Sequence, residues 1–203
     1  MLELFEFPPS GNCHKIRLML SFLGLPYESR VLNAAAREHK SESFLKLNPF
    51  GQVPVLKDGD VVLRDSQAIL VYLARQYGGD SWFPASAVLA AEVSGWLSVA
   101  ANEIVRGPAA LRAQHKFGRV IPHEEALAIT ETLLRVLDQH LTARNWLVGD
   151  NITIADVALY PYLALAGEGK VDLSPFQHLC AWLQRIENQP GYISMPGIHP
   201  QEN

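Results

Sequence analysis

The strongest constraint on the fold is a change in the pattern of the sequence near residue 78. Before that point, short apolar runs typical of strands alternate with apolar residues spaced along one helical face, in the order βαβ followed by ββα. The clearest signal surrounds Asp58-Gly59, because β-branched runs flank a dipeptide typical of tight hairpins. The predicted elements are strands at 2–7, 27–32, 53–57 and 61–63, with helices at 12–23, within 33–48 and at 65–78.

Beyond a linker at residues 79–85, the sequence shows helical patterns and no convincing strand pattern. Helices are expected at 86–106, 122–141, 153–166 and 176–189, followed by an irregular tail from Pro190 that is rich in proline and glycine. The sequence therefore predicts an α/β domain at residues 1–78 and an all-helical domain at residues 86–203.

Composition and charge argue against several classes of function. The chain has 17 basic and 21 acidic residues, and a net charge of −4 provides no strong field for nucleic acid or an anionic membrane. Cys13 and Cys180 lie far apart, so neither a disulfide scaffold nor a structural metal site is indicated. The first residues lack the basic region of a signal peptide, and no apolar run approaches the ~18 residues of a membrane span. A cytoplasmic protein is expected.

The first candidate site is the turn between the first strand and the first helix, which contains Ser10, Asn12 and Cys13. Such a turn presents unpaired main-chain N–H groups and the positive end of the helix dipole, which together favour an anion. Ser10 and Asn12 add hydrogen-bond donors, although either could simply cap the helix. Cys13 is a rival for the chemistry, because a helix N-terminus lowers the pKa of a thiol.

Two further candidates lie downstream. Val53-Pro54 places a residue without an N–H donor in a strand signal, so the proline lies at an edge or follows a cis bond. A cis bond would leave the Val53 main chain free to pair with an extended ligand. Asp65-Ser66 opens a helix, where the two side chains could bind a ligand's ammonium and carboxylate or serve as a cap.

These motifs occur in a fixed order and are followed by a helical half. This arrangement resembles that of the cytosolic glutathione transferase family. The resemblance covers nearly the whole chain, including Leu45–Leu56 (LKLNPFGQVPVL) and a Thr-x-x-Asp capping box at Thr153 and Asp156. It implies a thioredoxin-like N-terminal domain, an all-α C-terminal domain and a homodimer.

The resemblance also implies which residues bind glutathione. Val53–Pro54 matches the family's cis-proline site, with the Val53 main chain paired to the cysteinyl part of the tripeptide. Asp65 and Ser66 match the pair that holds the γ-glutamyl end, and Gln52 lies near that end.

A looser match concerns the loop with His39 and Lys40, which in the family commonly reaches the glycine carboxylate. The alternative is that this polar loop is simply solvated.

The catalytic assignment depends on Ser10. Thioredoxin-type redox proteins carry Cys-x-x-Cys at this turn, whereas this chain has Ser10-x-x-Cys13, so the reacting sulfur is expected to come from glutathione. Ser10 and Asn12 would then donate hydrogen bonds to it, and lowering a thiol pKa from about 8.5 to about 6.5 requires ~2.7 kcal/mol. No tyrosine lies at residues 5–10, which favours a serine/asparagine type similar to bacterial members over the tyrosine type.

The predicted function is transfer of glutathione to a hydrophobic electrophile, as in detoxification, with glutathione as co-substrate and no further cofactor. The alternatives are glutathione-dependent reduction of a disulfide or peroxide and, in a different class, a non-catalytic interaction protein. The electrophile pocket is expected in the helical half, around Asn102, Glu103 and Arg106.

Overall fold

The first half of the chain forms a four-stranded sheet with the strand order β2-β1-β3-β4. β1 (Leu2–Glu6) pairs in parallel with β2 (Tyr27–Val31) and antiparallel with β3 (Val55–Asp58). The predicted hairpin is confirmed, since β3 turns directly into β4 (Val61–Arg64). Gly59 supports this turn with φ at 58°, a conformation that costs glycine little.

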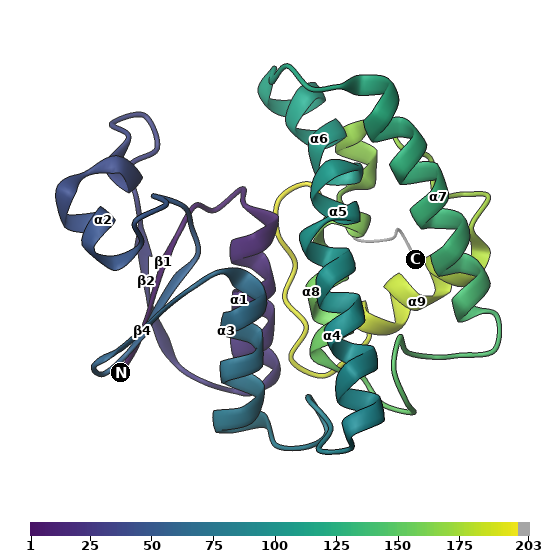
Figure 1. Cartoon of the computed structure of the whole chain (residues 1–203), viewed down its shortest axis with the longest axis horizontal. Helices are drawn as coiled ribbons and strands as arrows, with labels where there is room; N and C mark the ends of the chain where they lie inside the picture. The colour runs from purple at the N-terminus through teal and green to yellow at the C-terminus, as the bar shows by residue number, and fades with distance from the viewer. Residues whose placement is uncertain (199–203) are drawn as a thin grey trace.

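Helices flank this sheet on two sides (Figure 1). α1 (Gly11–Phe22) and α3 (Ser66–Leu73) lie between the sheet and the helical half, and α3 continues as a π-helical turn, η2 (Ala74–Gly78). On the other side lies α2 (Glu42–Leu47), preceded by a short 3₁₀ turn, η1 (Glu38–Lys40).

The structure, a computed structural model, describes residues 1–198, so the last five residues of the predicted helical domain and tail lie outside the described part. Within the second half, all regular elements described are helical. They are α4 (Ala87–Ala101), α5 (Glu103–Arg106), α6 (Pro108–Phe117), α7 (His123–Leu141), α8 (Ile154–Ala164), the 3₁₀ turn η3 (Ala166–Gly169) and α9 (Gln177–Glu187).

The helical half departs from the sequence-based prediction in two places. The helix expected at 86–106 is divided at Asn102 into α4 and α5. α6 was not predicted, because Gly107-Pro108 also marks the end of the preceding helix. Pro108 is the first residue of α6, where its missing N–H has no intrahelical partner to lose.

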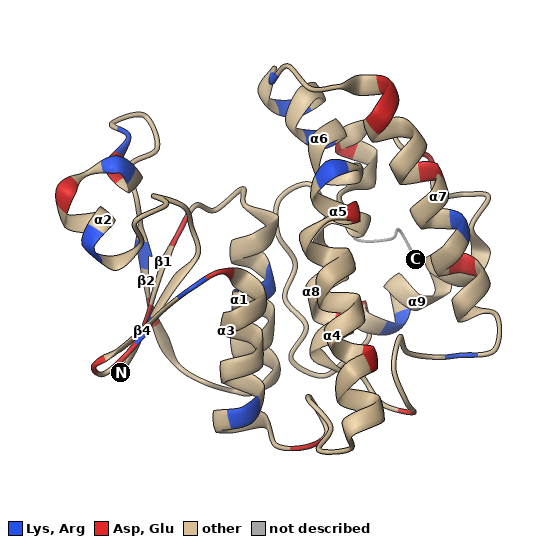
Figure 2. Cartoon of the chain, viewed as in Figure 1, with Lys and Arg blue, Asp and Glu red and all other residues tan. Residues whose placement is uncertain are grey.

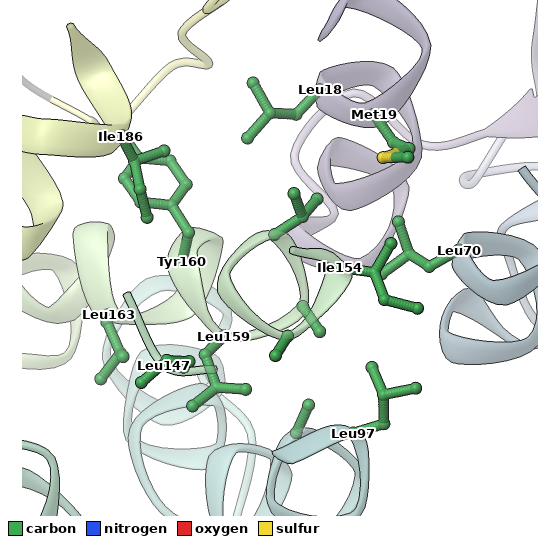
Figure 3. Packing of buried hydrophobic residues seen from close by; sticks show 14 of the residues in the cluster. Leu18, Met19, Leu70, Leu97, Leu147, Ile154, Leu159, Tyr160, Leu163 and Ile186 are labelled. Atoms are coloured by element: carbon green, nitrogen blue, oxygen red, sulfur yellow. The ribbon is translucent and has the colours of Figure 1, made fainter. Parts of the chain in front are cut away.

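α8 is the central helix of the molecule and joins the two lobes. It packs against α1 and α3 of the sheet lobe and against α4 and α9 of the helical lobe. In the close view of the core, Leu18 and Met19 of α1 and Leu70 of α3 lie on the side of Ile154, while Tyr160 lies beside Ile186 (Figure 3). Burial of this apolar surface fixes the relative position of the lobes.

The start of α8 is stabilised by the predicted capping box. The Thr153 side chain accepts a hydrogen bond from the first turn, and the Asp156 carboxylate accepts from Thr153 N at 2.9 Å. Asp156 is fully buried and also accepts from Trp182 Nε1 of α9 at 2.8 Å and from Leu147 N at 3.0 Å. One carboxylate therefore connects the cap of α8 with α9.

The tail from Pro190 to Ile198 is irregular, as predicted. It passes between α1 and α8 in the view of Figure 1, and Ser21 Oγ of α1 donates to Gly191 O at 2.6 Å. Most charged residues lie on the outer surfaces of the two lobes (Figure 2).

The segment Ala87–Phe117, which comprises α4 to α6, is by length and composition apolar enough to cross a membrane. Its most apolar 18-residue window has a mean hydropathy of 1.3, and 17% of that window is buried. A single segment of this kind is weak evidence for a span, and here the helix is interrupted at Asn102 and Gly107.

Candidate functional site

A cavity of about 560 Å³, here called the main cleft, lies where the sheet lobe meets the end of α4 and α5. It brings together residues that the sequence places as far apart as the first helix and the third. The predicted residues that line it are Asn12, His39, Lys40, Gln52, Val53, Pro54, Asp65 and Ser66.

The Val53–Pro54 peptide bond is cis, as the family resemblance implies. Pro54 is buried directly before β3, and Val53 is half-buried at the wall of the main cleft. Within residues 1–198, the Val53 N–H and C=O make no main-chain hydrogen bond. Both groups are therefore available to an extended ligand in the cleft.

The loop before Val53 is held by Asn48, which is buried. Its Nδ2 donates to Gln52 O at 2.7 Å, and its Oδ1 accepts from Phe50 N at 3.1 Å. Gly51 adopts φ at 58°, and a Cβ there would lie 2.7 Å from His39 O. Glycine is thus required at this position for two reasons, the backbone conformation and the close approach of the neighbouring loop.

Lys40 and His39 both border the cleft. Lys40 Nζ donates to Phe50 O at 2.9 Å, so this ammonium already holds the two loops together. The His39 ring packs edge-on against Phe7, with ring centroids 5.3 Å apart, and its buried Nδ1 has no hydrogen-bond partner in the described chain.

Asp65 caps α3 and borders the main cleft at the same time. Its Oδ1 accepts from Gln67 N at 2.9 Å and Ala68 N at 3.1 Å, while Oδ2 has no hydrogen bond among the described residues. Its φ of 74° is unusual for a residue with a side chain, and such conformations cluster at functional sites. Ser66 is buried and donates from Oγ to Gln67 Oε1 at 2.5 Å. Capping and ligand binding are therefore compatible here.

Ser10 is the N-cap residue of α1 and lines a second cavity of about 460 Å³. Its Oγ accepts from Cys13 N at 3.3 Å, which caps the helix and leaves the hydroxyl proton free for donation. The second cavity shares Phe7, His39 and Arg119 with the main cleft, so the two spaces adjoin. Asn12 lines the main cleft, and its Oδ1 is buried without a partner in the described chain.

Cys13 is fully buried. Burial raises the pKa of its thiol to about 11, against the smaller opposite effect of the Ser10 hydrogen bond. The expectation that the helix N-terminus lowers this pKa is therefore wrong, because loss of hydration outweighs the dipole.

The structure does not bring Asn102, Glu103 and Arg106 to either of these two cavities. Asn102 Nδ2 donates back to Ser98 O at 3.0 Å, and Arg106 is paired with Glu125. Glu103 lines a separate apolar groove between α4 and α7. From this part of the chain, the main cleft is instead lined by Ala101 and Val105.

The second cavity also contains two residues that no sequence motif predicts. The Tyr162 ring of α8 covers the first turn of α1, so closely that a Cβ on Gly11 would lie 2.8 Å from Tyr162 Cζ. Arg112 of α6 also lines this cavity. Both come from helices more than 90 positions away from Ser10, and no local pattern indicates such a contact.

No group of three or more histidine, cysteine or acidic side chains is placed to hold a metal ion in the part of the chain that the structure describes.

A thioredoxin-like lobe with a cis-proline opposite a serine turn, joined to an all-helical lobe, defines the two-domain class of glutathione-binding enzymes. Family profiles agree with this class. The profile described as "Glutathione S-transferase, N-terminal domain" matches residues 9–76, and "Glutathione S-transferase, C-terminal domain" matches residues 114–190. The chain belongs to the glutathione S-transferase family.

Individual relatives match over nearly the full chain. Glutathione S-transferase 3 of Zea mays is 34% identical over 205 residues, which cover 94% of this chain and 91% of the maize protein. The crystal structure of a glutathione S-transferase from Pseudomonas fluorescens is 33% identical with a TM-score of 0.89, covering 96% of this chain and 98% of the other. A homologue from Drosophila mojavensis, solved with bound glutathione, is 28% identical with a TM-score of 0.85 over 93% and 88% of the two chains.

Proposed function

We propose that this chain is a glutathione transferase of the serine/asparagine type, similar to bacterial members, that activates the glutathione thiol for attack on an electrophile. The observation that carries the proposal is the main cleft. There, the unpaired Val53 main chain shares one cavity with Asp65 at the start of α3 and Asn12 at the start of α1. The Val53 main chain suits an extended peptide and the Asp65 carboxylate suits its ammonium group, and the cleft adjoins the second cavity, which Ser10 lines.

In this proposal, each part of glutathione has its own partners. The cysteinyl unit pairs with the Val53 main chain beside Pro54, and the γ-glutamyl end binds Asp65, Ser66 and Gln52. The glycine carboxylate lies toward His39 and Lys40. The Lys40 ammonium is already held by Phe50 O, which fixes it for a carboxylate rather than leaving it to move freely.

The Ser10 hydroxyl donates a hydrogen bond to the glutathione sulfur and so stabilises its thiolate, supported by Asn12 and by the N-terminus of α1. Ser10 Oγ accepts from Cys13 N, so its own O–H remains available. The thiolate then attacks the electrophilic carbon: a C–S bond forms, the leaving group departs with its electron pair, and the thiol proton passes to solvent. No cofactor besides glutathione enters this scheme.

The electrophile is proposed to occupy the second cavity, since Ser10 lines it and it adjoins the main cleft. We further propose a cytoplasmic homodimer with a role in detoxification, built from domains at 1–78 and 86–203 joined by a linker at 79–85. Exposed apolar residues such as Tyr77 of η2, Val88 of α4 and Val105 of α5 support an interface between two copies.

The experiment is a direct comparison of reactions. The purified protein is assayed with glutathione and chlorodinitrobenzene, and in parallel with a small mixed disulfide and with a hydroperoxide. Conjugation well above the uncatalysed rate, with little turnover of the other two, supports the proposal. Rapid disulfide or peroxide reduction without conjugation would establish the alternative enzyme, and no activity together with no glutathione binding would indicate an interaction protein.

A further inference from the structure

The charged residues that line the second cavity are both basic. Arg112 and Arg119 contribute to its wall, and no aspartate or glutamate among residues 1–198 does so. Most of the remaining wall is apolar, including Phe7 and Phe117. A cavity of this composition offers contact to a hydrophobic body and positive charge to one end of it.

Arg112 is buried with an incomplete set of partners. Its Nη1 donates to Pro9 O at 3.0 Å and its Nε donates to Glu168 Oε2 at 2.5 Å. The third nitrogen, Nη2, is buried and has no hydrogen-bond partner among residues 1–198. A buried donor left without an acceptor is unfavourable, and the Arg112 guanidinium at the cavity wall therefore remains incompletely paired.

The local charge is not balanced by Glu168. This one carboxylate is shared between Arg112 and Lys116, so the group of three keeps a net positive charge. Arg119 adds a second positive charge, and its exposed guanidinium makes no ion pair in the described part of the chain. Figure 2 shows basic residues on α6 and acidic residues at the start of α7. The field in the second cavity therefore favours an anion.

The groove between α4 and α7 provides an internal comparison. It is also mostly apolar, but its charged lining residues are Glu103 and Glu125. Apolar surface alone thus does not distinguish the two spaces, whereas the sign of the charge does.

We propose that the second cavity selects electrophiles that carry a carboxylate, with Arg112 and Arg119 facing the anion and the apolar wall facing the carbon skeleton. This inference rests on the proposed function, because the electrophile must lie beside glutathione held in the main cleft. The carboxylate is a binding group and takes no part in the bond changes. Arg119 is the specificity-determining residue to test, since Arg112 also holds the Ser10 loop.

The test compares conjugates that differ by one charge. The ligands are S-benzylglutathione and its analogues with a carboxylate at the meta or para position of the ring. Calorimetry measures the dissociation constant of each ligand from the full-length protein in the oligomeric state in which it is purified. We expect at least one carboxylated conjugate to bind about 10-fold or more tightly than S-benzylglutathione, the effect of a charge-assisted hydrogen bond to Arg. Arg119→Gln should remove most of that advantage and weaken S-benzylglutathione, which lacks the carboxylate, by a clearly smaller factor. Arg135→Gln, an exposed arginine of α7 remote from this cavity, is the matched control.

Three results would overturn the inference. If the wild-type protein binds all conjugates equally, the cavity does not select for charge. If Arg119→Gln weakens all conjugates to the same degree, Arg119 serves glutathione itself through the main cleft. In both cases the proposed function stands. If no conjugate binds, the glutathione site itself is wrong, and the proposed function fails together with the inference.

Discussion

Arg112 Nη1 of α6 donates a hydrogen bond to the Pro9 carbonyl at 3.0 Å, which ties the helical lobe to the residue directly before Ser10. The preceding carbonyl, that of Pro8, accepts from Arg17 Nη2 of α1 at 3.0 Å. Arg17 is in turn paired with the buried Glu6. Two arginines, one from each lobe, thus hold consecutive carbonyls and fix the backbone that presents the Ser10 hydroxyl. Such fixed placement is what a hydrogen-bond donor to a reacting atom requires.

Removal of the contact from the helical lobe should therefore affect turnover more than binding. Arg112→Met should lower kcat for conjugation by about 10-fold and the free energy of unfolding by ~1–3 kcal/mol, because Pro9 O and Glu168 each lose a buried partner. The dissociation constant of glutathione should change little. Lys116→Met is the matched control, since it removes another partner of Glu168 but leaves the Pro9 bond intact. Equal kinetic losses in the two variants would contradict this role of Arg112.

The close approach of Tyr162 to Gly11 gives a second prediction. Gly11→Ala should destabilise the protein by ~1–3 kcal/mol, because the new Cβ would lie 2.8 Å from Tyr162 Cζ and the ring must move. Gly95→Ala in α4 is the control. A Cβ there meets nothing within 4 Å, so replacement of a helical glycine should stabilise by ~0.5–1 kcal/mol. Denaturant unfolding measures both, and the same sign for both variants would show that the contact does not constrain α1.

Asp65 caps α3 and is proposed to bind glutathione, and substitutions can separate these two roles. Asp65→Asn keeps an oxygen that can cap α3 but removes the charge, so it should weaken glutathione binding by ~1–3 kcal/mol with little change in the melting temperature. Asp65→Ala should reduce both. Calorimetry and thermal unfolding measure the two quantities, and full affinity in Asp65→Asn would show that Asp65 is only a cap.

His14 should make the protein sensitive to acid. It is fully buried, neither ring nitrogen has a partner in the described chain, and burial lowers its pKa to about 3. The unfolded chain, with a histidine pKa of about 6.5, binds the proton first as the pH falls. The titration of His14 therefore does not alter the free energy of unfolding above about pH 6.5. Below that pH it lowers the free energy of unfolding by ~1.4 kcal/mol per pH unit, down to about pH 3.

His14→Phe should accordingly reduce the slope of unfolding free energy against pH between about pH 6 and about pH 4. His178→Gln, which changes an exposed histidine, should leave that slope unchanged. Urea unfolding at a series of pH values measures it. An unaltered slope in His14→Phe would mean that the ring is protonated equally in both states.

The parts of the fold that the sequence predicts are those with a local cause. The Asp58-Gly59 hairpin and the Thr153–Asp156 capping box need only neighbouring residues, and both occur as expected. α6 was missed because Gly107-Pro108 has the same local appearance whether it ends one helix or begins the next.

The same distinction between local and long-range causes applies to the candidate site. Each motif proposed to bind glutathione is a short segment with its own signal, whereas the second cavity is assembled partly from distant helices. At the end of α4 the helical phase decides the outcome: Ala101 and Val105, four positions apart, face the main cleft, whereas Asn102 and Arg106 do not.

The central claim is that Ser10, and not Cys13, controls the reacting sulfur, and the pKa of the glutathione thiol in the complex tests it most directly. The ultraviolet absorbance of the bound thiolate is titrated against pH for the wild-type protein, Ser10→Ala and Cys13→Ala. We predict an apparent pKa near 6.5 in the wild-type complex, raised by about 1–2 units in Ser10→Ala with a loss of about 10–100-fold in kcat. Cys13→Ala should match the wild type in both quantities. An unchanged thiol pKa in Ser10→Ala, together with loss of activity in Cys13→Ala, would contradict the account and make Cys13 the nucleophile.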